Sequence, residues 1–301
     1  MTFDGLFTHA MIHELNQTLQ NGRVTKISQP YPNEVILTIR ANRTNYPVLL
    51  SANPRYARFQ ITQIPYTNPA VPTNFTMMLR KYLEGAKLLE IKQLDNDRVV
   101  YFEFLTRNEL GDKLPLLLSA EIMGRYSNVI LINQSTNKII DTIKHVGMDQ
   151  NRYRTLLPGA TYRQPPTQNK ENPFEQDSNT FEELIQKYPN REVLADNLLK
   201  QYQGISRDSA LALADKLHTS NNHVQAFNNF LAMTEDPIPT MNGNNFSIFT
   251  DNPNGKKFTT LSEMLDVFYH TKANRDRVQQ QGGQLLHVIR KNLQRNKKKL
   301  K

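Results

Sequence analysis

An aspartate-arginine pair opens a strand-like run in the sequence LDNDRVVYFEF, residues 94–104. The pair directly follows Asp95 and Asn96, which are typical residues of a tight turn. Arg98 would present a planar fork of donors to a base edge or a phosphate, and Asp97 could orient that fork. The ordinary alternative is a salt bridge between the two side chains at the start of a hairpin. Spacing alone leaves both interpretations open.

A second group of polar residues interrupts the strand-like sequence SAEIMGRYSNVILIN, residues 119–133. Gly124 and Arg125 separate what would be two strands, and Ser127 and Asn128 open the second one. A glycine at this point permits a bulge or a close approach of another backbone. The alternative is a plain turn between two core strands.

A short turn containing Gly204 and Ser206 joins two helical patterns, at 191–203 and 207–219. Backbone amides at the start of the second helix could bind a phosphate, with Ser206 as the N-cap. The surrounding region, 171–270, is acidic, with 7 Lys and Arg against 14 Asp and Glu. A structural hairpin or a contact with a protein is therefore an equal interpretation.

Signals for catalysis or metal binding are weak. The chain has no cysteine, which excludes disulfides, thiolate zinc sites and cysteine nucleophiles. His9 and His13 have helical i, i+4 spacing beside Glu14, but no HEXXH motif or third ligand accompanies them. Nucleophile elbows, phosphate loops and dinucleotide-binding glycine patterns are also missing. We therefore expect a binding protein, with no enzyme activity, cofactor or metal.

The net charge of +9 is unevenly distributed along the 301 residues. Residues 1–170 hold 20 basic against 13 acidic side chains, and residues 271–301 hold 10 against one. Together with the acidic region between them, this division predicts separate modules with separate partners. Basic segments attract phosphate backbones by releasing counterions.

Helical and strand-like patterns divide at about residue 170. Before it, we expect helices at 4–20 and 73–85 and antiparallel strands at 23–31, 34–41, 46–52, 88–95, 98–105, 113–123, 128–134 and 138–146. After a linker at 164–179, we expect helices at 180–188, 191–203, 207–219 and 222–233 and a hairpin around Asn242-Gly243. A basic helix follows, with a break or bend predicted at Gly282-Gly283.

No stretch of the sequence approaches the roughly 20 apolar residues that span a bilayer, so we expect no membrane insertion. Asp4 stands where a signal peptide would have a basic residue, and no cleavage site follows. These features favour a cytoplasmic protein.

Five ordered motifs resemble those of the NFACT family, also called the fibronectin-binding protein A family. They are FDGLFTHAMIHEL, FTMMLRKYLEGAKL, LDNDRVVYFEF, EIMGRYSNVILIN, and R-x-L-x-PG-x-x-Y from Arg154 to Tyr162. The resemblance implies an α+β fold, with an antiparallel β-rich domain at 1–170 similar to the N-terminal domain of formamidopyrimidine-DNA glycosylases. It further implies an all-α helix-hairpin-helix domain at 171–235, a β-hairpin and helix packing on it at 236–270, and the root of a coiled coil at 271–301.

The family resemblance implies a function in ribosome-associated quality control. Such proteins bind tRNA and a large ribosomal subunit blocked by peptidyl-tRNA, and they promote alanine tailing of the stalled chain without mRNA. The expected tRNA-binding residues are Asp97, Arg98, Glu121, Ile122, Met123, Gly124, Arg125, Ser127 and Asn128. The runner-up function is a surface adhesin that binds host fibronectin or fibrinogen, which would place the protein at the cell surface.

The glycosylase resemblance is not expected to extend to chemistry. Those enzymes use an N-terminal proline amine and a cysteine zinc finger, whereas this sequence begins Met1-Thr2-Phe3 and has no cysteine. We predict that the chain forms no borohydride-trapped adduct with damaged duplex DNA under conditions where a formamidopyrimidine-DNA glycosylase does. A covalent adduct with this chain would contradict the prediction.

Overall fold

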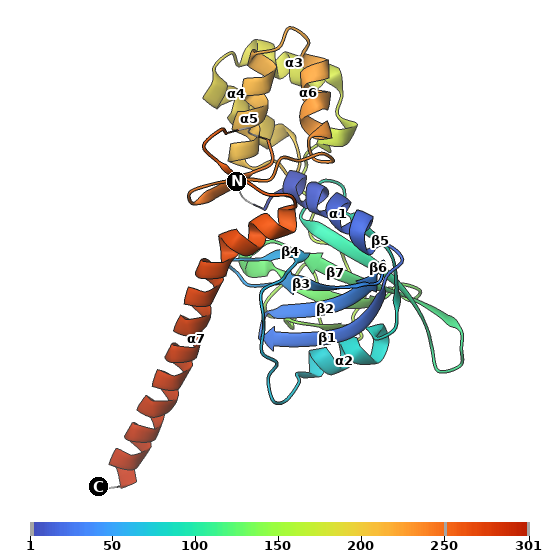
Figure 1. Cartoon of the computed structure of the whole chain (residues 1–301), viewed down its shortest axis with the longest axis vertical. Coiled ribbons are helices and arrows are strands. Elements are labelled where there is room, and N and C mark those ends of the chain that lie inside the picture. The colour runs from blue at the N-terminus through green and yellow to red at the C-terminus, as the bar shows by residue number, and fades with distance from the viewer. Residues whose placement is uncertain (1–2, 250–251, 300–301) are drawn as a thin grey trace.

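The computed structural model describes residues 3–249 and 252–299. A large twisted sheet forms one body, a group of short helices stands above it, and a long C-terminal helix projects from the junction between them (Figure 1). The combination of a large antiparallel sheet with several helices confirms the α+β fold class.

All nine strands of the sheet pair antiparallel, in the order β4-β3-β2-β1-β5-β6-β7-β8-β9. Their bounds are β1 Arg23–Tyr31, β2 Glu34–Ala41, β3 Thr44–Ser51, β4 Arg58–Ile61, β5 Lys87–Gln93, β6 Val99–Arg107, β7 Lys113–Glu121, β8 Asn128–Asn133 and β9 Lys138–Thr142. The strands that precede the helix predicted at 73–85 and the strands that follow it form one sheet, because Arg23 of β1 pairs with Lys87 of β5. Strand β4 was not predicted, and its four residues include the buried polar side chains Arg58 and Gln60.

Helix α1, Gly5–Leu19, packs its apolar side against the sheet, with Leu6, Met11 and Leu15 fully buried. The helical spacing of these residues produces one continuous apolar face. Helix α2, Asn74–Leu83, begins at the N-cap Thr73 and contacts β1, β6 and β9. Both helices lie close to their predicted positions.

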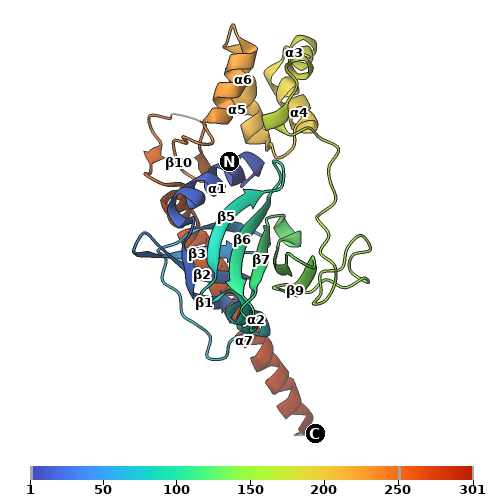
Figure 2. The ribbon, with the colours of Figure 1, turned by 90° about the vertical axis from the view of Figure 1, so that its right-hand side faces the viewer.

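The helices above the sheet are α3 Ser178–Lys187, α4 Arg191–Gln201, α5 Arg207–His218 and α6 His223–Ala232. The segment predicted as a linker, 164–179, contains a short 3-10 turn at Pro173–Glu175, and Glu171 forms a β-bridge with Tyr202. A small sheet follows, with strands β10 Thr240–Asn242, β11 Asn245–Ser247 and β12 Lys256–Lys257. Figure 2 shows the helices standing over the N-terminal end of α1. The helix-hairpin-helix assignment, the likeness to glycosylases and the four domain boundaries stay predictions.

Helix α7, Leu261–Lys299, is fixed to the sheet body along its first turns. The Glu14 carboxylate of α1 accepts hydrogen bonds from the amides of Leu261 and Ser262, at 2.6 and 3.1 Å, and so caps the helix. Further along, Asp266 accepts hydrogen bonds from Gln60 and Thr62 beside β4. The start of α7 is therefore anchored to the sheet body at two places, on α1 and beside β4.

The sequence predicts a break or a bend at Gly282-Gly283, and the break is wrong, because α7 is helical through both residues. Each glycine costs about 1 kcal/mol of helix propensity, but it keeps its backbone hydrogen bonds and does not by itself end a helix. Beyond the glycines, Leu285, Ile289 and Leu293 are more than half exposed. A coiled-coil partner for this face stays a prediction.

The Asp4 carboxylate joins the sheet body to the helices above it. Its Oδ1 accepts the Phe7 amide of α1 at 2.8 Å, and its Oδ2 accepts the Ser206 amide at 3.1 Å and the Ser209 hydroxyl at 2.7 Å in α5. One buried side chain thus caps α1 and binds the N-cap residue of α5, two helices that are far apart in sequence. Burial raises the pKa of Asp4 above its usual value, although these donors oppose the rise.

Three chain segments meet at this junction. Gly5 and Gly204 approach each other so closely that a Cβ on either would overlap the carbonyl oxygen of Asn96. The buried Asn96 side chain donates to the Gln203 carbonyl at 2.8 Å. The turn before Arg98 is therefore held between the N-terminus of α1 and the α4–α5 turn.

We predict that Asp4→Ala lowers the free energy of unfolding by about 3 kcal/mol, because the cap of α1 is removed and the donors of Ser206 and Ser209 at the start of α5 are left unpaired. Urea denaturation would measure the change. Asp177→Ala is the matched control, since Asp177 is exposed and caps only α3. Equal losses in the two variants would contradict the role of Asp4 as a joint between two helices.

Candidate nucleic-acid interface

Asp97 and Arg98 form the end of the turn between β5 and β6, and both side chains are partly exposed. The Asp97 carboxylate accepts the Arg98 backbone amide at 2.7 Å, so it fixes the turn and does not pair with the guanidinium. Within the described residues, the Arg98 guanidinium has no hydrogen-bond or ion-pair partner. The salt-bridge alternative is therefore absent here, and the five donors of Arg98 remain available to a ligand.

The structure brings this turn next to the second predicted motif. The Ile122 amide donates to the Arg98 carbonyl at 2.8 Å, and Val99 pairs with Glu121 across β6 and β7. The chain positions that follow β7 therefore lie beside the positions that precede β6. Asp97, Arg98 and the 121–125 segment share one end of the sheet.

Within the second motif, Arg125 and Tyr126 are exposed. Arg125 lies in a 3-10 turn, Gly124–Tyr126, and its guanidinium stacks over the exposed Tyr126 ring at 4.7 Å. Gly124 has a φ of 55°, a conformation that glycine adopts without strain. Met123 and Gly124 are partly exposed, and the Met123 amide donates to the Ser127 hydroxyl at 2.8 Å.

Other residues expected at the interface are buried: Glu121, Ile122, Ser127 and Asn128. Glu121 is fully buried and forms a two-pronged ion pair with Arg154, at 2.8 and 2.5 Å. The Tyr162 hydroxyl donates to the same carboxylate at 2.9 Å. Burial and the Glu121 charge raise the pKa of Tyr162, so its hydroxyl stays protonated as a donor. Glu121 therefore fixes the end of β7 to Arg154 and Tyr162 through buried contacts.

Sequence reasoning did not assign functions to Arg154 and Tyr162. Both belong to the R-x-L-x-PG-x-x-Y motif, so a signal was present. The pattern could not show that its two ends meet on Glu121, which lies 33 and 41 residues earlier.

The carboxylate of Asp4 already occupies the phosphate site predicted at Gly204 and Ser206. Ser206 is the N-cap of α5 as expected, and its hydroxyl accepts the Ser209 amide at 3.3 Å. Its own amide donates to Asp4. These contacts favour the structural interpretation of the hairpin, because a phosphate would have to displace the Asp4 carboxylate.

No cluster of three or more metal-ligating side chains is found in residues 3–249 and 252–299. His9 stacks on the Phe174 ring at 4.2 Å, and its neighbour His13 lies 3.0 Å from the Gln17 amide nitrogen. Across the same residues, no helix combines the length and apolar character that crossing a membrane requires.

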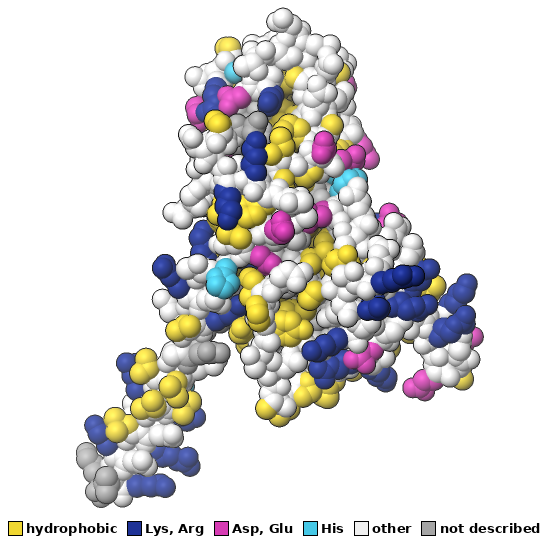
Figure 3. Space-filling model, in the orientation of Figure 1, with side chains coloured by type: hydrophobic (Ala, Val, Ile, Leu, Met, Phe, Trp, Pro, Cys, Tyr) yellow, Lys and Arg dark blue, Asp and Glu magenta, His cyan; other side chains and the backbone are white. Residues whose placement is uncertain are grey.

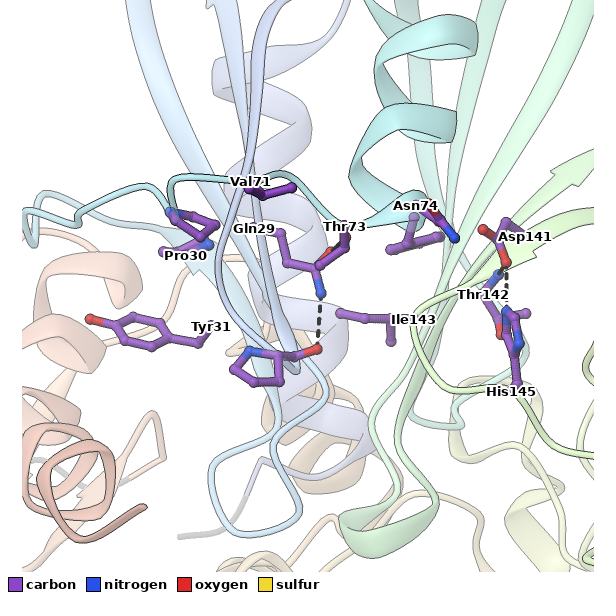
Figure 4. Close-up of a pocket in the computed structure, with 13 residues that line it drawn as sticks. Gln29, Pro30, Tyr31, Val71, Thr73, Asn74, Asp141, Thr142, Ile143 and His145 are labelled. Carbon is purple, nitrogen blue, oxygen red and sulfur yellow. Dashed lines mark hydrogen bonds and ion pairs between the residues drawn. The ribbon is translucent and has the colours of Figure 1, made fainter. Parts of the chain in front are cut away.

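A separate cavity of about 430 Å³ lies where β1, α2 and the end of β9 meet (Figure 4). Its wall includes Gln29, Thr73 and Ile143. Asp141 and His145 face each other across its edge at 2.8 Å.

On the face shown in Figure 3, Lys and Arg side chains gather over the sheet body and along α7.

Comparison with known families decides the classification. A family model described as NFACT N-terminal and middle domains matches residues 4–301. The chain belongs to the NFACT family. It is 43% identical over 302 residues to Rqc2 homolog RqcH of Streptococcus pneumoniae, and 38% identical over 315 residues to Rqc2 homolog RqcH of Bacillus subtilis. Both matches cover 100% of this chain and 54% of the relative, so the chain spans about half the length of these NFACT relatives.

Solved structures of similar sequence share the NFACT fold of this chain. The N-terminal part of the fibronectin/fibrinogen-binding protein from Streptococcus suis has a TM-score of 0.83 at 41% identity, covering 90% of this chain and 100% of that one. The fibrinogen binding protein from Staphylococcus aureus has a TM-score of 0.72 at 32% identity, covering 89% and 99%.

We predict that Arg154→Met lowers the free energy of unfolding by about 3 kcal/mol, since it leaves the Glu121 charge buried without its partner. The double variant Glu121→Gln with Arg154→Met should recover part of the loss, because no unpaired charge remains. Thermal or urea unfolding of the two variants tests this. A double variant less stable than Arg154→Met alone would contradict the coupling.

Proposed function

We propose that this NFACT chain acts in ribosome-associated quality control, by binding tRNA and a large ribosomal subunit obstructed by peptidyl-tRNA. In this proposal it promotes mRNA-independent alanine tailing of the stalled chain. Membership of the family and the similarity to proteins named Rqc2 homolog RqcH support the assignment. The proposed role is binding and positioning, without an enzymatic reaction by the chain itself.

The observation that carries the proposal is the Arg98 guanidinium, which has no partner within the described residues and lies at the same end of the sheet as Arg125. Main-chain hydrogen bonds hold both segments, so the two arginines are displayed on a rigid edge. Arginine forks suit phosphate oxygens and base edges, and a stacked Arg–Tyr pair offers a flat surface to a base. An RNA ligand fits this chemistry.

A second candidate function is binding of host fibronectin or fibrinogen. It is favoured by the solved neighbours that carry these names, which share the fold at 41% and 32% identity. The basic N-terminal domain would also attract acidic host proteins by charge alone. Such attraction weakens as salt rises, because the Debye length falls to about 8 Å at physiological ionic strength.

We predict that Asp97→Ala with Arg98→Ala lowers the affinity for unfractionated tRNA by about 5- to 150-fold, as expected for loss of about 1–3 kcal/mol of arginine contacts. Fluorescence titration would measure it, and the melting temperature should fall only slightly, because the double variant removes one hydrogen bond within the turn. Arg107→Ala is the matched control, because Arg107 is an exposed arginine at the opposite end of β6. Equal loss of affinity in control and double variant would contradict a specific site.

The same variants separate the two functions. An adhesin function predicts fibronectin binding that persists at physiological salt and survives Asp97→Ala with Arg98→Ala. It also requires surface labelling of intact cells. Fibronectin binding that disappears at physiological salt would reduce this candidate to nonspecific charge attraction.

A further inference from the structure

The buried Asn128 has a clear structural task at the start of β8. Its side-chain amide donates to the Lys144 carbonyl at 2.9 Å, and its oxygen accepts the Lys144 backbone amide at 3.1 Å. The Thr142 hydroxyl donates to the same carbonyl at 2.7 Å. Two buried side chains therefore fix the backbone of Lys144, which lies just beyond β9.

The Lys144 side chain reaches away from this clamp to the loop after β3. Its ammonium donates to the Ala52 carbonyl at 2.6 Å, and the side chain is half-buried. Burial lowers the pKa of Lys144. Within the described residues, no carboxylate pairs with this ammonium. Since an ammonium has three N–H donors, the bond to Ala52 leaves a positive charge whose other donors are unused.

The loop after β3, which accepts the hydrogen bond from Lys144, also lies against the candidate interface. A Cβ on Gly124 would lie 3.8 Å from the carbonyl oxygen of Pro54, two positions after Ala52. Asn128 pairs with Glu121 across β7 and β8. The ammonium, the Gly124–Tyr126 turn and the Arg98 turn therefore belong to the same end of the sheet.

We propose that Lys144 binds a backbone phosphate of the RNA, and that Asn128 and Thr142 are its positioning residues. The inference rests on the proposed function, because it adds a phosphate contact to the interface of Arg98 and Arg125. An ammonium is a compact point charge without the arginine fork, so it suits a phosphate oxygen better than a base edge. The proposal also gives the buried Asn128 a function within the predicted tRNA-binding motif.

A purely structural function of Lys144 makes a different prediction. If the ammonium only tethers the 52–56 loop, its removal should loosen the loop and lower the melting temperature. The protein would then bind the same number of RNA phosphates as before. Salt dependence distinguishes the two, because the slope of log K against log salt falls by about one unit for each phosphate that the protein no longer neutralises.

The test is titration of unfractionated tRNA with the whole chain between about 50 and 200 mM salt. Lys144→Met is expected to weaken binding and to make the salt slope shallower by about one unit, whereas Lys144→Arg keeps the slope. Lys138→Met is the matched control. Lys138 begins β9 and is exposed, and within the described residues its ammonium bonds only to the Thr161 hydroxyl, so its removal should leave the slope unchanged.

Thr142→Val tests the positioning function, because valine keeps the shape and removes one donor to the Lys144 carbonyl. We expect about fivefold weaker tRNA binding, from the absence of one hydrogen bond. The lysine proposal is overturned if Lys144→Met leaves the slope unchanged, whether or not the melting temperature falls. Retained binding by Asp97→Ala with Arg98→Ala would instead overturn the proposed function, so the two failures are distinguishable.

Discussion

The arrangement of the molecule depends on the hydrogen bonds that the Asp4 carboxylate accepts. One oxygen caps α1, which packs on the sheet, and the other binds the start of α5 in the helical unit. Because both helix N-termini share one buried anion, neither can move without leaving amide donors unpaired. The same junction encloses Asn96 between Gly5 and Gly204. The placement of the helices and the placement of the Arg98 turn are consequently a single structural constraint.

This constraint explains how exposed arginines can belong to a rigid surface. Backbone groups on both sides of Arg98 are bonded to buried segments, through Gln93 to the Asp97 carbonyl and through the Ile122 amide to the Arg98 carbonyl. The buried Glu121–Arg154 pair supports the neighbouring strand end. Within the described residues the Arg98 guanidinium has no partner, whereas the Arg125 guanidinium donates to the hydroxyl of its exposed neighbour Tyr126. Preorganised donors lose little entropy on binding, so such an edge is suited to recognition.

Local sequence patterns predicted most helices and strands, because each has its own periodicity or turn residues. Long-range pairings were beyond them. Asp4 is of a residue type that caps helices and directly precedes α1, but its second partner, Ser206, lies 202 residues away. Strand β4 was missed because its buried Arg58 and Gln60 are polar, and Gln60 is satisfied by Asp266 of α7. Local patterns drew attention to Asp97 and Arg98, and the family resemblance assigned them to tRNA binding. The division between exposed Arg125 and buried Asn128 required the fold.

Native-state hydrogen exchange of the Phe7 and Ser206 amides tests the Asp4 junction most directly. Both amides donate to Asp4, so the account predicts that they open together, with a free energy close to that of the sheet core at Leu118. Resolved amide exchange rates across increasing denaturant would measure the three values. Joint opening near the global unfolding free energy would support a shared cap. Rapid exchange of Ser206, while Phe7 and Leu118 remain protected, would contradict it.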